Sequence, residues 1–115
     1  MQRGEVRLID LEPTRGSHAN QRRPGIIVSN DGDKATADRI GRGVVTVVTV
    51  TSNTLRVFPF QVLLPANITG LRVDSKAQAE QVRSVTIERI GPVLGWVPAQ
   101  VMAEVGEALR LHLQL

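Results

Sequence analysis

A short run of apolar, β-branched residues at positions 44–50 (VVTVVTV) is the strongest pattern in the chain. It is nearly all apolar and too short for a typical helix, so it predicts a buried β-strand. Weaker strand patterns lie on both sides of it, at residues 4–11, 25–29, 58–64, 79–85 and 92–97. The remaining connections predict a turn at 65–70, the start of a further short strand at 71–74, and a helical turn at 86–90.

The end of the chain changes to a helical pattern. Apolar residues recur there at every fourth position, as Val101, Val105, Leu109 and Leu113. This spacing predicts an amphipathic helix over residues 98–113, with Pro98 suited to its first turn. Many short strands followed by one terminal helix favour a mainly β fold, a small, partly closed barrel with the helix packed on it. We expect residues 1–115 to form a single domain.

A polar loop at residues 12–23 precedes the second strand pattern and ends in Arg22-Arg23-Pro24. A connection of about twelve residues is long for a compact domain, and such loops are often functional. Arg23 precedes a proline, which favours extended backbone and holds it at the mouth of the strand. Its guanidinium fork matches phosphate oxygens. The plainer interpretation is a surface arginine that caps a turn.

A second polar group, Thr51-Ser52-Asn53, ends the strongest strand. These residues suit hydrogen bonding to a phosphate better than attack on one, since no general base is adjacent in sequence. The alternative is a simple hydroxyl turn, which is common at strand ends. We predict that this strand end meets the one at Arg23 and binds a phosphodiester.

Other titratable residues supply candidates for proton transfer. His18 lies in the long loop and titrates near neutral pH, as a general base or acid should, although loop histidines are usually only solvated. In residues 80–83 (EQVR), alternation puts Glu80 and Val82 on one strand face, with Gln81 and Arg83 on the other. A cross-strand ion pair is the plainer interpretation of these charges. Two distant histidines without a third ligand give no metal motif.

Composition narrows the function classes. The chain is 42% apolar and 22% charged, as in ordinary globular proteins. The absence of cysteine excludes disulfides and thiolate metal sites and fits a reducing compartment. There is no apolar run of transmembrane length and no signal-peptide pattern, so we expect a cytoplasmic protein without membrane contact.

The charge balance is compatible with a polyanionic partner. Twelve of the fourteen basic residues are arginine, and the sequence pI is about 10.6. The chain has only three aromatic residues, Phe58, Phe60 and Trp96. If nucleic acid binds, base stacking is therefore not expected to be the main interaction, and phosphate contacts and backbone groups must supply it.

Taken in order, these segments resemble the MazF/PemK (Kid) family of toxin endoribonucleases from bacterial toxin–antitoxin pairs. The resemblance covers nearly the whole chain and rests on RGEVRLIDLEPTRGS, QRRPGIIVSN, VVTVTSN, DSKAQAEQVRSV and the terminal EALRLHL. It implies an SH3-like barrel, the fold shared with CcdB toxins, assembled as a homodimer. It also implies metal-free cleavage of single-stranded RNA at short sequences, blocked by the extended C-terminal segment of a cognate antitoxin.

The resemblance also implies roles for individual residues. Arg23 matches the arginine taken as catalytic, Thr51 the threonine that binds the scissile phosphate, and Glu80 an acidic position that contributes in some members. Some members carry a catalytic histidine at the position that Ser17 occupies in this chain. His18 lies one position after it. The candidate substrate-binding residues are Ser52, Asn53, Arg15, Gln81 and Arg83.

RNA carries its own nucleophile, the 2′-hydroxyl, so this chemistry needs neither a metal nor a nucleophile from the protein. In that scheme Arg23 stabilises charge on the phosphoryl group, and Thr51 with Ser52 holds a non-bridging oxygen. Either His18 or Glu80 is the general base. A competing interpretation is a non-catalytic, CcdB-like toxin that binds a protein target such as gyrase. A further one is an RNA-binding barrel without activity.

Overall fold

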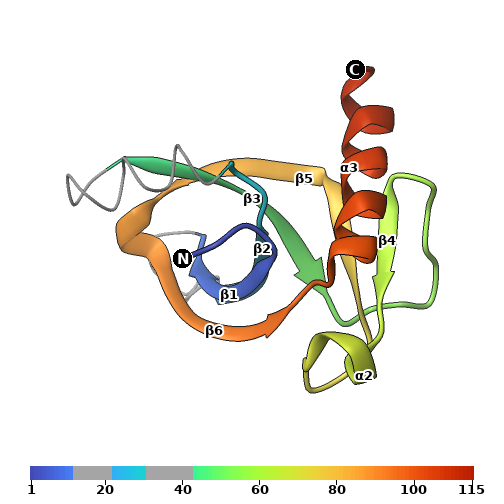
Figure 1. The fold of residues 1–115 in the computed structure, drawn as a ribbon, viewed down its shortest axis with the longest axis horizontal. Coiled ribbons are helices and arrows are strands. Elements are labelled where there is room, and N and C mark those ends of the chain that lie inside the picture. Colours follow the sequence, from blue (N-terminus) through green and yellow to red (C-terminus); the bar gives the residue numbers. More distant parts are fainter. Residues whose placement is uncertain (12–21, 31–42) are drawn as a thin grey trace, which may run out of the picture.

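The computed structural model describes residues 1–11, 22–30 and 43–115. Its six strands pair antiparallel in one sheet of order β4–β5–β3–β2–β1–β6. The strands are β1 (Glu5–Asp10), β2 (Arg22–Ile27), β3 (Val44–Thr51), β4 (Gln61–Leu64), β5 (Ser75–Thr86) and β6 (Ile90–Trp96). Figure 1 shows the sheet curling so that β5 and β6 wrap around β1 and β2. The edge strands β4 and β6 do not pair with each other, so the barrel is partly open, as predicted.

Helical elements complete the described part of the chain. They are α2 (Ala66–Thr69), the 3-10 turn η1 (Ile87–Arg89) and α3 (Ala99–Leu113). The predicted terminal helix is confirmed, and its buried residues are Val101, Met102, Val105 and Ala108. Figure 1 places α3 beside β4 at one side of the sheet. No helix in the described ranges is long and apolar enough to cross a membrane.

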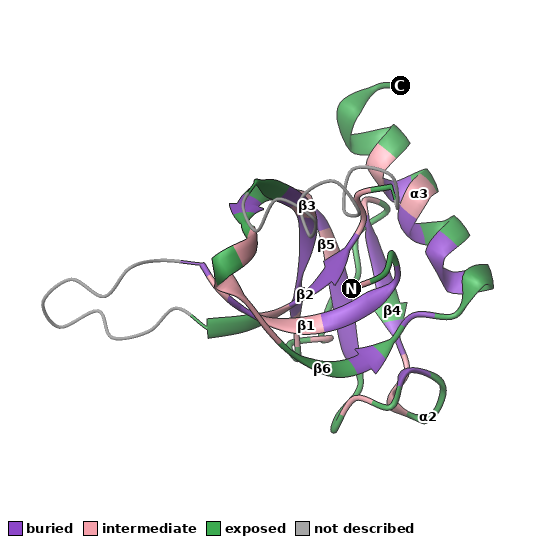
Figure 2. Cartoon of the chain, turned by 60° about the vertical axis from the view of Figure 1, so that its left-hand side comes forward, coloured by how far each residue is buried: buried purple, intermediate pink, exposed green. Residues whose placement is uncertain are grey.

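Side-chain alternation divides the interior into two cores, one on each face of β1, β2 and β3. Figure 2 colours the buried residues of these strands purple. The helix-side core takes even-numbered strand residues, namely Val6, Ile26, Val48 and Val50, together with the buried face of α3. The barrel-side core takes odd-numbered ones, namely Ile9, Leu11, Ile27, Val45 and Val47, together with Val85 of β5. Each fully buried aliphatic side chain contributes roughly 1.5–3 kcal/mol, so both faces of these strands stabilise the fold.

The structure differs from the predicted strands at several boundaries, and three of the differences have a clear physical reason. The strand at 25–29 begins earlier, at Arg22, so Arg23 belongs to β2 and pairs with Ile9 of β1 rather than ending a loop. The strand at 58–64 begins only at Gln61, because Pro59 cannot donate to a sheet ladder and the N–H of Phe58 donates to the Gln61 side chain. The strand expected at 71–74 is absent, since Asp74 accepts a hydrogen bond from the first residue of α2, Ala66.

Candidate functional site

The two strand ends singled out in the sequence lie side by side. Strands β2 and β3 pair antiparallel, with Gly25 opposite Thr49 and Ile26 opposite Val48. Continuing this register toward the start of β2 brings Arg23 opposite Thr51. On the other side of β3, Thr51 pairs with Lys76 of β5. The two strand ends therefore lie on neighbouring strands, and the contact of Arg23 with Thr51 stays a prediction.

Gly25 makes room for a buried side chain of β1. A Cβ atom at position 25 would lie 2.5 Å from Cδ1 of Ile9, which is fully buried in the barrel-side core. Because position 25 is glycine, the side chain of Ile9, the register partner of Arg23, can pack directly against β2. The start of the strand that carries Arg23 thus rests on the apolar core.

Beyond this point the same sheet face becomes polar. Thr49 is buried, and its Oγ1 donates to Oε1 of Gln78 at 3.3 Å. Gln61 is 8% exposed and pairs with Gln78 across β4 and β5. Its Nε2 donates to Oε2 of Glu80 at 2.7 Å. We call Thr49, Gln61, Gln78 and Glu80 the polar cluster.

An irregularity in β5 brings Glu80 into this cluster. The pairing of β3 with β5 shifts from Val48–Val82 to Thr49–Gln78, which leaves residues 79–81 of β5 without register partners in β3. As in a β-bulge, the extra residues reorient the side chains. Ala79 and Val82 both pack on the helix-side core, whereas Glu80 bonds to the polar cluster. The predicted regular alternation of Glu80 with Val82 on one face is therefore wrong.

The Glu80 carboxylate has one oxygen in use and one unused. Oε2 accepts the bond from Gln61, while Oε1 is shielded from solvent and has no hydrogen-bond partner. A buried acceptor without a partner is rare in folded proteins and calls for an explanation. Within the described ranges Glu80 forms no ion pair, so the neutral amide of Gln61 takes the place of the expected cross-strand pair.

The geometry can now be set beside known proteins. Residues 2–113 match the family described as "PemK-like, MazF-like toxin of type II toxin-antitoxin system". The chain belongs to this toxin family. It is 58% identical over 115 residues to Endoribonuclease MazF9 of Mycobacterium tuberculosis. The alignment covers 100% of this chain and 98% of that protein.

Solved structures of similar fold agree with this assignment. MazE–MazF from Deinococcus radiodurans (Form-III) has a TM-score of 0.75 at 26% identity, covering 100% of this toxin and 97% of that chain. A mycobacterial endoribonuclease in complex with its cognate antitoxin has a TM-score of 0.77 at 23% identity, covering 100% of this toxin and 96% of that chain. The second likeness supports the fold alone.

Other predicted site residues of the toxin have structural partners. Thr51 Oγ1 accepts from the N–H of Asn53 at 3.2 Å, and Asn53 Oδ1 accepts from the N–H of Leu55 at 3.3 Å. The hydroxyl turn considered above therefore forms, and the hydroxyl hydrogen of Thr51 stays free to donate elsewhere. Ser52 and Gln81 are exposed. Arg83 Nη2 donates to the Leu11 carbonyl at 3.2 Å and so tethers the end of β1.

Two of the predicted residues, Arg15 and His18, lie outside the residues that the structure describes. Of the two candidate bases, only Glu80 can thus be placed. Within the described ranges, no group of three or more histidine, cysteine, aspartate or glutamate side chains is placed to hold a metal ion.

Sequence reasoning did not single out Lys76, because a lysine is usually a solvent-exposed residue. It is instead 7% exposed, its ammonium donates to the Arg56 carbonyl, and it lies 5.9 Å from the Phe58 ring centroid. Phe58 stacks in parallel on Phe60, with ring centroids 5.5 Å apart. Two of the three aromatic residues therefore lie close to the register partner of Thr51, which only the folding of residues 52–60 onto β5 could reveal.

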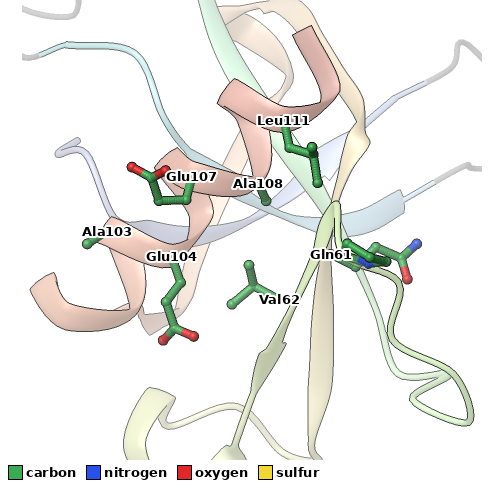
Figure 3. Close-up of a pocket in the computed structure, with 8 residues that line it drawn as sticks. Gln61, Val62, Ala103, Glu104, Glu107, Ala108 and Leu111 are labelled. Carbon is green, nitrogen blue, oxygen red and sulfur yellow. The ribbon is translucent and has the colours of Figure 1, made fainter. Parts of the chain in front are cut away.

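A groove that shares Gln61 with the polar cluster lies between β4 and α3 (Figure 3). Its lining includes Val62, Ala108 and Leu111 with two acidic residues, Glu104 and Glu107. Two carboxylates make this groove unsuitable for a phosphate backbone. The basic and hydroxyl side chains lie instead at Arg23, Thr51 and Lys76.

Proposed function

We propose that this toxin cuts single-stranded RNA at short, specific sequences without a metal, through attack of the RNA 2′-hydroxyl. The cuts would inhibit translation and growth. The chain is an endoribonuclease toxin of a toxin–antitoxin pair, as its family and its full-length relative indicate. The observation that carries the mechanism is the pairing of Gly25 with Thr49, each two residues from Arg23 and Thr51, together with the pairing of Thr51 with Lys76 on its other side.

In the proposed reaction the 2′-oxygen forms a bond to phosphorus and the bond from phosphorus to the 5′-oxygen breaks. A general base takes the proton of the 2′-hydroxyl, and an acid returns one to the departing 5′-oxygen. The guanidinium of Arg23 stabilises charge on the phosphoryl oxygens, and the free hydroxyl hydrogen of Thr51 binds a non-bridging oxygen. The products are a 2′,3′-cyclic phosphate and a 5′-hydroxyl.

Glu80 is the candidate base that the described geometry supports, with His18 as the alternative. Its unused oxygen, Oε1, is an acceptor with no partner in the protein. Arg23 is the candidate proton donor. Gln81 and Arg83 are assigned to the RNA groove, as the family resemblance implies. Ser52, Asn53 and Arg15 are further candidate substrate-binding residues, with Ser52 beside Thr51 at the non-bridging oxygen.

The proposal also covers partners. The Deinococcus structure of similar fold contains MazE with MazF, which supports control of this toxin by a cognate antitoxin. We assign the contact to an extended C-terminal segment of the antitoxin and the active form to a homodimer. Residues 1–115 would act as a single toxin domain in the cytoplasm, where its RNA substrate is.

The test is incubation of the purified protein with a long single-stranded RNA in excess EDTA, followed by mapping of the product ends. Discrete cuts that leave cyclic or 3′-phosphate ends with 5′-hydroxyl partners are expected. Intact RNA from folded protein would contradict the proposal and favour the CcdB-like alternative. That alternative predicts inhibition of gyrase, which a supercoiling assay measures.

A further inference from the structure

Gln61 contacts the Glu80 carboxylate, although nothing in the sequence pattern assigns it a role. Its Nε2 donates to Oε2 of Glu80 at 2.7 Å, a short bond typical of a charge-assisted donor–acceptor pair. Gln61 is only 8% exposed, although glutamine is mostly a surface residue. A buried amide that meets a carboxylate directly needs a further explanation.

The orientation of the Gln61 amide is fixed from its other side. Its Oε1 accepts from the N–H of Phe58 at 3.1 Å, and its own backbone N–H donates to the Phe58 carbonyl at 2.8 Å. Exchanging the amide oxygen and nitrogen would turn the oxygen toward Glu80 and the nitrogen toward an N–H donor. Both side-chain bonds would be lost, so the network determines which way the amide points.

Gln61 therefore joins two parts of the candidate site. The connection that begins at Thr51 returns through Phe58 to Gln61, and Gln61 in turn contacts Glu80. With Oε2 occupied by the amide, the rotation of the carboxylate is restricted and Oε1 keeps one direction. Oε1 is the oxygen without a partner.

We propose that Gln61 is a positioning residue: it holds the Glu80 carboxylate through Oε2, so that Oε1, which is shielded in the free protein, accepts the 2′-hydroxyl proton once bound RNA opens access to it. The inference rests on the proposed function, in which Glu80 is the base. Gln61 itself does not touch the RNA in this role. Its contribution is to hold Glu80 in one reactive geometry, because small displacements of a catalytic group reduce the rate strongly.

The experiment measures kcat and KM on a short RNA that contains one mapped cut site. Gln61→Met keeps the length and apolar packing of the side chain and removes both side-chain hydrogen bonds. We expect kcat to fall about tenfold to a hundredfold, the effect of one lost charge-assisted bond, with KM unchanged. Gln100→Met makes the same change at an exposed position of α3 and should leave both constants unchanged.

A double-mutant cycle with Glu80→Gln separates positioning from a structural role. If Gln61 acts through Glu80, Gln61→Met causes no further loss once Glu80 is replaced. Losses that multiply in the double variant, or a Gln61→Met protein with the kcat of the wild type, would overturn the proposal. Should Gln61→Met fail to fold, Gln61→Glu carries the test: it keeps the acceptor for Phe58 and replaces the donor to Glu80 with a second, repelling carboxylate, so kcat should fall at least as far as in Gln61→Met.

Failure of the underlying function is distinguishable in the same measurements. If the wild-type protein does not cut RNA, the proposed function fails. If the wild type cuts RNA and Glu80→Gln is fully active, the proposed endoribonuclease function is kept. The role of Glu80 as base and the positioning role of Gln61 are then both excluded.

Discussion

Lys76 lies directly across from Thr51 in the register of β3 and β5, and within the described ranges only Lys76 and Glu5 are buried charged residues. In the described ranges its ammonium bonds a carbonyl oxygen and takes part in no ion pair. Burial of a cation without an anionic partner is costly, and a bound phosphate would supply one. The site thus has a second positive group in addition to Arg23.

A Lys76→Met variant tests this contact. We expect weaker binding of a non-cleavable, 2′-deoxy-substituted RNA, because one phosphate contact is lost. The slope of log Kd against log salt concentration should fall by about 0.7, the value for one contact on a single strand. Arg110→Met, at an exposed position of α3, is the control. An unchanged slope in Lys76→Met would show that the lysine holds only the Arg56 carbonyl.

Arg23 and Arg22 form a matched pair on opposite faces of β2. Arg23 pairs with Ile9, whereas Arg22 pairs with Asp10, and both arginines are exposed. We expect Arg23→Ala to lower kcat about 100- to 1,000-fold, the usual cost of removing a donor to transition-state charge. Arg22→Ala should have little effect on kcat. Equal losses in the two variants would indicate a general loss of positive charge rather than a catalytic arginine.

Arg23→Lys refines that test. Lysine keeps the positive charge and loses the bidentate fork of the guanidinium. We expect activity between that of the wild type and Arg23→Ala, measured as kcat on the same RNA. Full activity of the lysine variant would mean that charge alone is sufficient at this position.

Alanine substitutions at two glycines outside the site should change the stability of the fold in opposite directions. A Cβ at Gly95 would lie 2.5 Å from the backbone oxygen of Thr69, whereas one at Gly106 in α3 meets nothing within 4 Å. Gly95→Ala should therefore destabilise the fold by about 1–3 kcal/mol, the range for overpacking. Gly106→Ala should stabilise it by about 1 kcal/mol through helix propensity. Chemical denaturation measures both, and changes of equal sign would contradict the packing described for β6 and α3.

The ion pair of Glu5 and Arg7 predicts how stability depends on pH. Burial raises the pKa of Glu5, but hydrogen bonds from the Gln2 N–H and from Arg7, at 3.0 Å, more than offset this, and the net pKa is lowered. A lowered folded-state pKa stabilises the protein at pH values above the unfolded value, near 4.5, and this stability is lost on acidification. The stability difference between wild type and Glu5→Gln should narrow as pH falls below that value. A difference independent of pH would contradict this assignment.

The fold could be predicted largely from local patterns. The run at 44–50 and the four-residue repeat of α3 reflect strands and a helix whose buried faces are continuous in sequence, and both elements were found. The adjacency of the strands that carry Arg23 and Thr51 was also predictable, since Arg23 lies at the start of one apolar strand and Thr51 at the end of the next. Strand boundaries at Gln61 and Arg22 depended on individual hydrogen bonds that a pattern does not encode.

The polar cluster could not be predicted, for a physical reason. Gln61 and Glu80 are distant in sequence and meet only because β4 pairs with β5 and because β5 bulges at residues 79–81. A bulge changes which face each following residue occupies, and neither glutamine nor alanine signals it. The burial of Lys76 was not predictable either, because it depends on residues 52–60 covering it.

The measurement that tests the central claim most directly uses one RNA in two forms, with either a ribose or a 2′-deoxyribose at the cleaved position. If the RNA supplies its own nucleophile to the site at Arg23 and Thr51, the deoxy form binds with similar affinity and is not cut. Cleavage of the deoxy form at a rate comparable to that of the ribose form would contradict the mechanism. The attacking group would then have to come from water or from the protein.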